Sequence, residues 1–494
     1  MQILKREQIK KLVEIDTKRN HYDIDSLILS QAVGLYEKII KDSPRKVLIV
    51  CGNNLNGDCG LLLADLLKKR SKIDCEIIHY CLNNRQYCSL IKQDGINVYE
   101  QIRDIKRAIA ENDYIIDCIY GIDLQERVFY PYDLFIEWIN NKEKSYVLSC
   151  DIPSGLNCDN GTIYGNCIKA TETLTWQLGK AGMYLYPGNT YCGKITIENI
   201  GISYQSIEEI KSNYQINDWT DIKKMLPQRY SHSHKGTYGK VLLIAGSEDT
   251  TGAAILCGKT ILKTGAGLLT VLSYPEVIAI FKQSLPEAMT VCLQNNIIYQ
   301  MEHFDFSHFD LVVIGPGLSR SKNTEILLQY VLKSDKDVLI DADGLFYLKN
   351  NLSLLKREQL TVITPHLIEY QRIFAYDSSR ILEDLASILK IYQNLIIVLK
   401  SENTIIAYRD KVTINTCGNN ALAKGGSGDV LAGCISGFLA QRSDLKSVIA
   451  AVYVHSFAAD LWLRNHSPYS LLASDLIGCI DEILYEAVKE KEKC

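Results

Sequence analysis

Short apolar runs alternate along the chain with longer stretches that carry apolar residues at helical spacing. The runs are rich in β-branched residues and bounded by Gly, Asp or Asn, which is typical of central strands in parallel sheets. We expect such strands at residues 47–51, 114–116, 146–150, 241–245, 311–314, 338–340 and 395–399. Residues 56–70 and 251–263 have the length and periodicity of helices. The alternation predicts α/β layers around parallel sheets.

A polar segment, residues 203–221, separates two halves of the chain. The length of 494 residues suits about two to four domains. The apolar content of 47%, with 23% charged residues, is typical of globular proteins. A new run of Gly-rich motifs begins at His234. We therefore expect two α/β domains, residues 1–215 and 216–494, each large enough for a core of its own.

Charge and cysteine usage exclude several classes of protein. The 54 basic and 58 acidic residues give a net charge of −4, which offers no basic excess for a nucleic-acid backbone. No apolar stretch reaches the roughly 18 residues of a membrane helix, and the charged start lacks the apolar core of a signal peptide. The 16 cysteines form no CxxC pair. We expect a cytoplasmic protein without membrane or nucleic-acid partners, with reduced core cysteines; oxidation-sensitive surface thiols are the alternative.

Residues 423–433, Ala-Lys-Gly-Gly-Ser-Gly-Asp-Val-Leu-Ala-Gly, join a glycine-rich loop to the start of an apolar helical pattern. Glycines let the backbone approach a ligand, and free N–H groups at a helix N-terminus attract anions. Asp429 would lie beside this anion site, where a carboxylate can take a proton from a hydroxyl that attacks a phosphoryl group. A simple turn with Asp429 as the helix cap is the alternative for this loop alone.

Four further polar motifs in the second half each follow a short apolar run. They are Gly315-Pro316-Gly317, Asp341-Ala342-Asp343, Thr364-Pro365-His366 with Glu369, and Lys400 with Thr404. Each has an ordinary explanation by itself, as a helix cap, a loop residue or a solvated charge. Ligands of open α/β sheets bind beyond the carboxyl ends of the strands. Together with the glycine-rich loop, the motifs predict one convergent site.

The second half resembles the ADP- or ATP-dependent NAD(P)H-hydrate dehydratase family, of the ribokinase-like superfamily, over about residues 225–485. Besides the motifs above, the matching segments are His234-Lys235-Gly236-Thr237-Tyr238-Gly239-Lys240-Val241, Gly246-Ser247, Gly252-Ala253-Ala254, Thr264-Gly265-Ala266-Gly267-Leu268, Pro286-Glu287-Ala288-Met289 and Ala473-Ser474-Asp475. The resemblance implies a ribokinase-like three-layer fold and a repair reaction. A nucleotide phosphorylates the hydroxyl of hydrated NADH or NADPH, phosphate is eliminated, and the dihydronicotinamide returns.

This resemblance also implies roles for single residues. Asp429 matches the family's proposed base, and the contacts to the hydrated cofactor fall on Ala253, Gly317, His366 and Asp429. The nucleotide contacts fall on Lys400, Ser401, Thr404, Gly425, Gly426, Ser427 and Gly428. Ser401 replaces the glycine that usually follows the lysine, which we expect to alter the nucleotide fit slightly. The phosphoryl donor is ADP or ATP with Mg²⁺, and the sequence does not choose between the two nucleotides.

In the first half, residues 51–61, Cys-Gly-Asn-Asn-Leu-Asn-Gly-Asp-Cys-Gly-Leu, lie between an expected strand and an expected helix and suit a phosphate-binding loop. Asp117 and Asp151 each follow an expected strand. With Asn56 and the Ser154 hydroxyl, they offer hard oxygen ligands for an alkali or alkaline-earth cation and one candidate acid–base group. Helix capping by the two aspartates is the alternative.

This half resembles the NAD(P)H-hydrate epimerase family, which has a Rossmann-like fold, over about residues 5–205. The best matches are Lys169-Ala170-Thr171, Thr173-Leu174-Thr175, Gly179-Lys180-Ala181-Gly182, Pro187-Gly188, Gly193-Lys194 and Asn199-Ile200-Gly201. The resemblance implies a three-layer Rossmann-like domain that interconverts the R and S forms of the hydrate and binds K⁺. It implies catalysis by Asp151, substrate contacts at Asn56, Gly57, Gly121 and Asp151, and a cation at Asn56, Asp117 and Ser154.

Departures from the epimerase pattern cluster around the predicted site. Aligned without gaps, the family loop Gly-Asn-Asn-Gly-Gly-Asp-Gly falls on residues 54–60. In this alignment Leu55 replaces Asn, Asp58 replaces Gly and Cys59 replaces Asp. An alignment shifted by one insertion restores other matches, so the register stays open. Ile122-Asp123 stands for Thr-Gly, and Ala32-Val33 for Ala-Gly. Asp58 brings a negative charge to where a pyrophosphate would approach amides. We therefore expect a weakened epimerase, or a scaffold that has lost the activity.

The whole sequence predicts a two-domain enzyme that repairs hydrated NAD(P)H and, as is frequent in this family, forms a homo-oligomer. One alternative is a ribokinase-like kinase of a small vitamin-precursor alcohol, which would share Asp429 and the glycine-rich loop but release a stable phosphate ester. A second alternative is that the first half is a non-catalytic Rossmann-like module that regulates the second.

Overall fold

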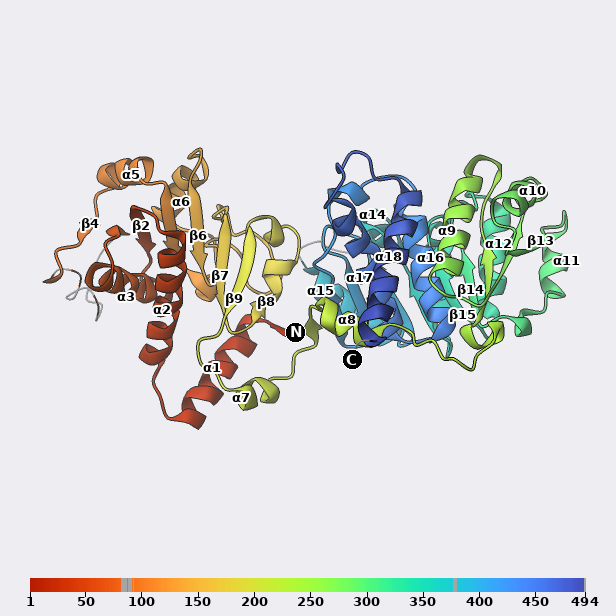
Figure 1. The fold of residues 1–494 in the computed structure, drawn as a ribbon, viewed down its shortest axis with the longest axis horizontal. Coiled ribbons are helices and arrows are strands. Elements are labelled where there is room, and N and C mark those ends of the chain that lie inside the picture. The colour runs from red at the N-terminus through yellow and green to blue at the C-terminus, as the bar shows by residue number, and fades with distance from the viewer. Residues whose placement is uncertain (81–86, 88–90, 92, 376–379, 493–494) are drawn as a thin grey trace. The chain divides into compact units, whose positions relative to one another are not determined.

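The structure is a computed structural model that describes residues 1–80, 87, 91, 93–375 and 380–492. The chain forms two compact units, Met1–Gln215 and Ile216–Cys494. Each unit is built of helices packed on a sheet of parallel strands (Figure 1), so the predicted α/β class is confirmed.

The first unit contains a fully parallel sheet in the order β4-β3-β2-β5-β6-β7-β9. Its strands are β2 (Lys46–Cys51), β3 (Asp74–His79), β4 (Asn97–Tyr99), β5 (Tyr114–Cys118), β6 (Tyr146–Cys150), β7 (Glu172–Trp176) and β9 (Lys194–Glu198). The three strands predicted for this half, at 47–51, 114–116 and 146–150, correspond to β2, β5 and β6. Because both faces of these strands are covered, their apolar runs are continuous.

Helices cover both faces of this sheet. Ile49 packs with α2 (Ile24–Asp42) and α3 (Leu55–Arg70), whereas Leu48 and Val50 pack with α5 (Ile102–Glu111) and α6 (Tyr132–Asn140). The short strands β1 (Ile3–Leu4) and β8 (Gly179–Lys180) pair in parallel beside the sheet. The unit also contains α1 (Arg6–Asn20), α7 (Tyr204–Glu209) and β10 (Tyr214–Gln215).

In the second unit the strands follow the order β13-β12-β11-β14-β15-β16-β17-β18-β19, parallel up to β17 and antiparallel beyond it. They are β11 (Lys240–Ile244), β12 (Leu268–Ser273), β13 (Met289–Cys292), β14 (Leu311–Ile314), β15 (Asp337–Ile340), β16 (Thr361–Ile363), β17 (Leu395–Leu399), β18 (Ile405–Tyr408) and β19 (Lys411–Ile414). The four predicted strands of this half are therefore present, with limits that differ by at most one residue.

One large core lies between this sheet and α8 (Trp219–Met225), α9 (Thr251–Lys263), α16 (Ser427–Gln441), α17 (Leu445–Trp462) and α18 (Ala473–Glu492). The remaining helices are α10 (Pro275–Ser284), α11 (Ile297–Glu302), α12 (Lys322–Lys333), α13 (Asp343–Leu348), α14 (Leu367–Phe374) and α15 (Ile381–Ile391). Within the described residues, no helix is both long and apolar enough to cross a membrane.

The strand orders locate the places where each sheet can bind a ligand. In the first unit the chain runs outward from β2 to β3 and β4, then returns to begin β5 on the other side of β2. In the second unit the same reversal separates β11 from β14. Open α/β sheets bind ligands at such points, beyond the carboxyl ends of the strands. Ligand-binding residues are therefore expected in the loops that follow these four strands.

Candidate active sites

The glycine-rich loop of the second unit leads directly into α16. Gly426 has φ +91°, and a Cβ at this position would come within 2.8 Å of the Cβ atom of Ala473. Only glycine fits there without strain. Gly425 faces open space, and Gly426 occupies the N-cap position of α16. The first amides of a 15-residue helix thus lie beside an accessible glycine loop, which is the arrangement of an anion site.

Asp429 lies in the first turn of α16 and does not cap the helix. Burial, together with the neighbouring Asp341 and Asp343, raises the pKa of this carboxyl to about 7, although Lys400 opposes the shift. A carboxyl group that titrates near neutral pH is suited to accept a proton during a reaction. The capping alternative for Asp429 is therefore not what the structure contains.

Lys400 follows β17 and is an ion-pair partner, not a solvated charge. Its Nζ lies 3.1 Å from Oδ1 of Asp341, which is 2% exposed and also accepts a hydrogen bond from Oγ1 of Thr364 at 2.5 Å. Although burial lowers the pKa of Lys400, the carboxylates of Asp341 and Glu369 raise it above its usual value. A Cβ at Gly428 would be 3.6 Å from this Nζ. The end of β17 and the start of α16 therefore meet.

The two other predicted nucleotide contacts lie in the turn between β17 and β18. Ser401 Oγ donates to the carbonyl of Asn403 at 2.6 Å, and the carbonyl of Thr404 accepts from the amide of Asn415 at 2.8 Å. Both residues are half-buried. The replacement of glycine by Ser401 thus adds a side chain that closes the turn.

Ala253 and Gly317 adjoin each other at the reversal between β11 and β14. The amide of Gly246 donates to the carbonyl of Pro316 at 2.9 Å, which joins the two loops. Gly317 has φ +58°, and a Cβ there would lie 2.9 Å from the Cβ atom of Ala253. Thr250 Oγ1 donates to the carbonyl of Gly317 at 2.6 Å. These two predicted substrate contacts therefore belong to one surface.

His366 caps α14, which the sequence analysis did not predict. Its Nδ1 accepts from the amides of Ile368 and Glu369 at 3.1 and 3.3 Å, and the amide of His366 donates to Glu369 Oε2 at 2.9 Å. The side chain remains 49% exposed. Nδ1 therefore serves the helix, and Nε2 lies 3.5 Å from Glu369 Oε1. The exposed half of the side chain is the part that a ligand can reach.

One residue of this site, His455 on α17, has no sequence signal. Its Nε2 lies 3.1 Å from the carbonyl oxygen of Ser427 and 3.4 Å from Ser427 Oγ. Because a carbonyl oxygen only accepts, Nε2 carries the hydrogen. Burial lowers the pKa of His455 to about 4, so the ring is neutral at physiological pH. His455 thus supports the first turn of α16 from behind.

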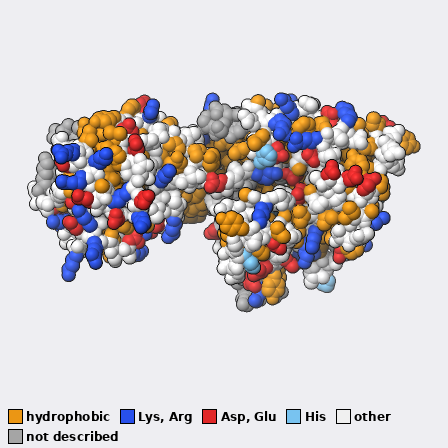
Figure 2. Space-filling view, turned by 90° about the horizontal axis from the view of Figure 1, so that it is seen from above, with side chains coloured by type: hydrophobic (Ala, Val, Ile, Leu, Met, Phe, Trp, Pro, Cys, Tyr) orange, Lys and Arg blue, Asp and Glu red, His pale blue; other side chains and the backbone are white. Residues whose placement is uncertain are grey.

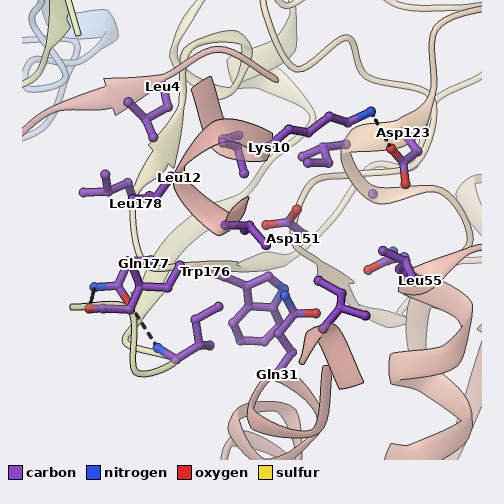
Figure 3. A pocket seen from close by; sticks show the side chains of 18 of the residues that line it. Leu4, Lys10, Leu12, Gln31, Leu55, Asp123, Asp151, Trp176, Gln177 and Leu178 are labelled. Carbon is purple, nitrogen blue, oxygen red and sulfur yellow. Dashed lines mark hydrogen bonds and ion pairs between the residues drawn. The ribbon is translucent and has the colours of Figure 1, made fainter. Parts of the chain in front are cut away.

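In the first unit, a cavity of about 460 Å³ lies beside the reversal between β2 and β5. Most of its lining is apolar, with side chains from α1, Trp176 and Leu178 (Figure 3). Asn56, Gly121 and Asp151 line it, and a Cβ at Gly121 would be 3.1 Å from Cγ of Asn56. Three of the four predicted substrate contacts thus share one cavity.

Gly57, the fourth predicted contact, lies in the first turn of α3 behind the cavity wall. A Cβ at this position would come within 1.9 Å of the carbonyl oxygen of Gly52, so the loop and the helix approach each other too closely for any other residue. Asn54 caps α3 by accepting from the amide of Gly57 at 3.0 Å, and its Nδ2 donates to the carbonyl of Ile119 at 2.8 Å. These contacts fix the loop between β2 and β5.

Asp117 and Ser154, two of the predicted cation ligands, form a buried network behind the cavity. Asp117 Oδ1 accepts from Ser154 Oγ at 2.6 Å and from the amide of Ile119 at 3.2 Å. Oδ2 accepts from the amide of Ser154 at 2.8 Å and from Ser149 Oγ at 2.9 Å. Burial raises the pKa of Asp117, against the effect of these hydrogen bonds. Neither Asp117 nor Asp151 caps a helix.

The third predicted cation ligand, Asn56, donates from Nδ2 to the carbonyl of Cys150 at 3.3 Å. The three residues offer hard oxygens around a buried carboxylate, a donor set that suits an alkali cation. Each Asp117 oxygen already accepts two hydrogen bonds, so a bound cation would compete with these bonds. The described residues contain no group of three or more His, Cys, Asp and Glu that could hold a metal.

Asp151 is held at the end of β6 by a lysine that the sequence analysis assigned no role. Lys180 forms a buried ion pair with Asp151 Oδ1, which also accepts from Thr175 Oγ1 at 3.2 Å. Asp151 has φ +71°, a conformation that costs a non-glycine residue about 1–3 kcal/mol and is found where the surroundings enforce it. At one side of the same cavity, Lys10 and Asp123 lie 3.5 Å apart (Figure 3).

The departures from the epimerase loop have distinct surroundings. Leu55 is 45% exposed beside the cavity, and Asp58 is buried in the first turn of α3. Cys59 is buried with its Sγ 3.9 Å from that of Cys150. No disulfide forms among the cysteines of the described residues, and most of them are buried, as predicted.

On the face drawn in Figure 2, lysine and arginine side chains are interspersed with aspartate and glutamate.

Comparisons with known proteins cover both units. A family model described as NAD(P)H-hydrate dehydratase matches residues 241–482, and one described as YjeF-related protein N-terminus matches residues 26–182. The chain is 31% identical to the bifunctional NAD(P)H-hydrate repair enzyme Nnr of Dictyoglomus turgidum, over 99% of this chain and 100% of that one. It is 36% identical to the ADP-dependent (S)-NAD(P)H-hydrate dehydratase of Bacillus subtilis, over 54% of this chain and 96% of that one.

Among solved structures, a ribokinase-like superfamily protein of Enterococcus faecalis V583 is similar, with 27% sequence identity and a TM-score of 0.51. The similarity covers 56% of this chain and 97% of that one. The ribokinase-like fold predicted for the second unit is therefore confirmed.

Proposed function

The chain belongs to the family of bifunctional NAD(P)H-hydrate repair enzymes, and on that premise we propose how its two units divide the repair. The second unit dehydrates the S form of the hydrate with a nucleotide as phosphoryl donor. The first unit converts the R form to the S form. The observation that carries the dehydratase assignment is the meeting of Lys400, Asp341 and Asp429 at the glycine-rich start of α16.

In the dehydratase step, the hydroxyl oxygen of the hydrate attacks the terminal phosphorus of the nucleotide, and Asp429 takes the proton of this hydroxyl group. The amides of Gly425, Gly426, Ser427 and Gly428, with Lys400, stabilise the charge that develops on the phosphates. Phosphate then leaves with the C–O electron pair, the neighbouring carbon loses a proton, and the ring double bond forms again. Phosphorylation is required because hydroxide is a poor leaving group.

The substrate is bound at the reversal between β11 and β14, by Ala253, Gly317 and His366. The nucleotide base lies towards Ser401 and Thr404 in the turn after Lys400. The donor is ADP or ATP with Mg²⁺, which neutralises phosphate charge when bound and takes most of its ligands from the phosphates and water.

The test of this assignment uses pure S-form hydrate of NADH with ADP or ATP and Mg²⁺. A dehydratase forms NADH and inorganic phosphate in equal amounts. A kinase of a small alcohol would leave the hydrate unchanged or convert it to a stable phosphate ester, and accumulation of that ester without NADH would contradict the proposal.

In the first unit, Asp151 is the acid–base group, and Asn56, Gly57 and Gly121 shape the contact with the hydrate. Support comes from the cavity that Asn56, Gly121 and Asp151 line together. Asn56, Asp117 and Ser154 hold a K⁺ ion, which supplies positive charge beside a buried carboxylate. The acidic Asp58 and Asp123, where the family has glycine, weaken the attraction of this unit for the dinucleotide phosphates.

The protein acts on NADH or NADPH hydrate in the cytoplasm, a location supported by the largely buried cysteines of the described residues, none of which forms a disulfide. The chain forms a homo-oligomer, since symmetric assemblies are the common state of such enzymes. Neither a membrane nor a nucleic acid is part of this function.

A further inference from the structure

A buried lysine lies behind the carboxylate of Asp151 in the first unit. Lys180, on β8, is 1% exposed. Its ammonium group donates to Asp151 Oδ1, to Thr175 Oγ1 at 2.7 Å and to the carbonyl of Trp176 at 3.2 Å. An ammonium group has three N–H donors. All three are therefore used inside the protein, and none is left to contact a substrate.

The two oxygens of Asp151 have different surroundings. Oδ1 accepts from Lys180 and from Thr175, so it is fixed in place. Oδ2 accepts no hydrogen bond from any residue that the structure describes, and the carboxyl group lines the cavity (Figure 3). The backbone of Asp151 is left-handed, with φ +71°. One oxygen is thus anchored, and the other is presented to a ligand.

Epimerisation of the hydrate requires a group that can move a proton between two atoms. Water adds to the enamine of the dihydronicotinamide so that the hydroxyl group is on the carbon bonded to the ring nitrogen. When a base removes the O–H proton, the O–H electron pair forms a C=O bond and the C–N bond breaks towards nitrogen. The base then delivers the same proton to nitrogen. Ring closure on the other face of the carbonyl, by the reverse steps, gives the epimer without any oxidant or reductant.

We propose that Lys180 and Thr175 are positioning residues for this proton transfer, an inference that rests on the epimerase function proposed above. They hold Oδ1 so that Oδ2 of Asp151 faces the hydroxyl group. General acid–base catalysis requires first that the base lies within hydrogen-bonding reach of the proton, and only then that its basicity is suitable.

The experiment measures conversion of R-form to S-form hydrate by the full-length chain without nucleotide, so that the dehydratase is silent. The variants are Lys180→Met, Lys180→Arg, Thr175→Val and Asp151→Asn. Lys69→Met serves as the matched control, because Lys69 is an exposed lysine of α3 that pairs with Asp65 away from the cavity. Dehydration of S-form hydrate with nucleotide, and the melting temperature, are recorded for every preparation.

We expect Lys180→Met to lower kcat by on the order of 100-fold with KM changed by less than about threefold, because orientation is lost and binding is not. Thr175→Val lowers kcat by on the order of tenfold, and Lys180→Arg recovers part of the loss. Asp151→Asn removes the activity, and Lys69→Met leaves it unchanged. Thr175→Val tests the inference even where Lys180→Met unfolds, because it leaves the ion pair in place.

Two results would overturn the inference, and they are distinguishable. In the first result, the wild-type chain epimerises the hydrate, and Lys180→Met or Thr175→Val keeps the wild-type kcat or changes only KM and the melting temperature. This result contradicts the positioning role but not the epimerase function. A wild-type chain that dehydrates the S form but does not epimerise the R form contradicts the epimerase function, and the inference falls with it.

Discussion

At the scale of single residues, the dehydratase site depends on carboxylates that are held close together in a buried place. Asp429 and Asp341 repel each other electrostatically, and Lys400 compensates one of them. A carboxyl group of ordinary pKa would be a poor base for an alcohol at neutral pH. Burial and the neighbouring charge bring Asp429 to the range where it can both accept and return a proton.

Replacement of Asp429 by asparagine tests this role. Asp429→Asn keeps the size of the side chain and removes the base. We expect turnover to fall by two or more decades, while hydrate and nucleotide binding stay within about threefold of wild type. Steady-state rates and equilibrium binding of both ligands check this. Wild-type turnover in the variant would remove Asp429 from the mechanism.

The raised pKa of Asp429 also predicts the pH dependence of dehydration. The base acts as the carboxylate, and its pKa is about 7. We therefore expect kcat/KM to rise about tenfold per pH unit below 7 and to level off above it. The pH profile with S-form hydrate checks this. Lys400→Met, which removes the charge that opposes the shift, moves the rising limb to higher pH; a profile flat between pH 5 and 7 contradicts the account.

The sequence predicted these residues to different degrees, for physical reasons. Asp429 and Lys400 were predictable because each belongs to a short motif at the end of a strand, where ligands bind. The ion pair between Lys180 and Asp151, and the contact of His455 with Ser427, join residues 29 and 28 positions apart. A single sequence carries no signal for such pairs, since a lysine after an apolar strand and a histidine in an apolar helix have no local pattern of their own.

At the scale of secondary structure, the predicted strands were correct because fully covered parallel strands are continuous apolar runs. The edge strands β4, β9 and β13 lack that pattern because they have exposed or half-buried residues, and they were not predicted. The strands β3, β7, β12, β16, β18 and β19 were not predicted either, although most of their residues are buried. The start of α16 is supported by a second helix, α17, whose His455 donates a hydrogen bond to the carbonyl of Ser427.

This helix–helix contact predicts a loss of stability in acid. The pKa of His455 is about 4 in the folded protein and about 6.5 when unfolded, so below pH 6.5 the unfolded chain binds a proton that the folded chain does not. His455 therefore does not lower the free energy of unfolding above pH 6.5. Between pH 6.5 and pH 4 it lowers this free energy by up to about 1.4 kcal/mol per pH unit. We expect His455→Gln to flatten the decrease in melting temperature between pH 6.5 and 4.5; equal slopes in both proteins contradict this.

The ends of β5 and β6 predict a specific effect of K⁺. A cation held by Asn56, Asp117 and Ser154 binds only the folded unit, so saturating K⁺ stabilises it by about 1–3 kcal/mol, or a few degrees in melting temperature. Melting curves in equal concentrations of KCl and choline chloride measure this. The Asp117→Asn variant is expected to melt at the same temperature in both salts. A wild-type chain that also shows no difference has no K⁺ site.

At the scale of the whole molecule, two α/β units of the same chain carry consecutive steps of one repair. Hydration of NAD(P)H gives both epimers, and the dehydratase accepts one of them. A chain with both units clears the mixture, whereas a chain with only the second leaves the R form. Because Leu55, Asp58 and Asp123 depart from the epimerase pattern, we expect the first unit to be the slower of the two.

The most direct test follows R-form and S-form hydrates of NADH, resolved by chromatography, in one reaction with the full chain, ADP or ATP, Mg²⁺ and K⁺. The account predicts that the S form disappears first into NADH, and that the R form then declines faster than its spontaneous rate, through the S form. Loss of the S form with an R form that decays only spontaneously would contradict a bifunctional enzyme. It would leave the first unit without catalytic function.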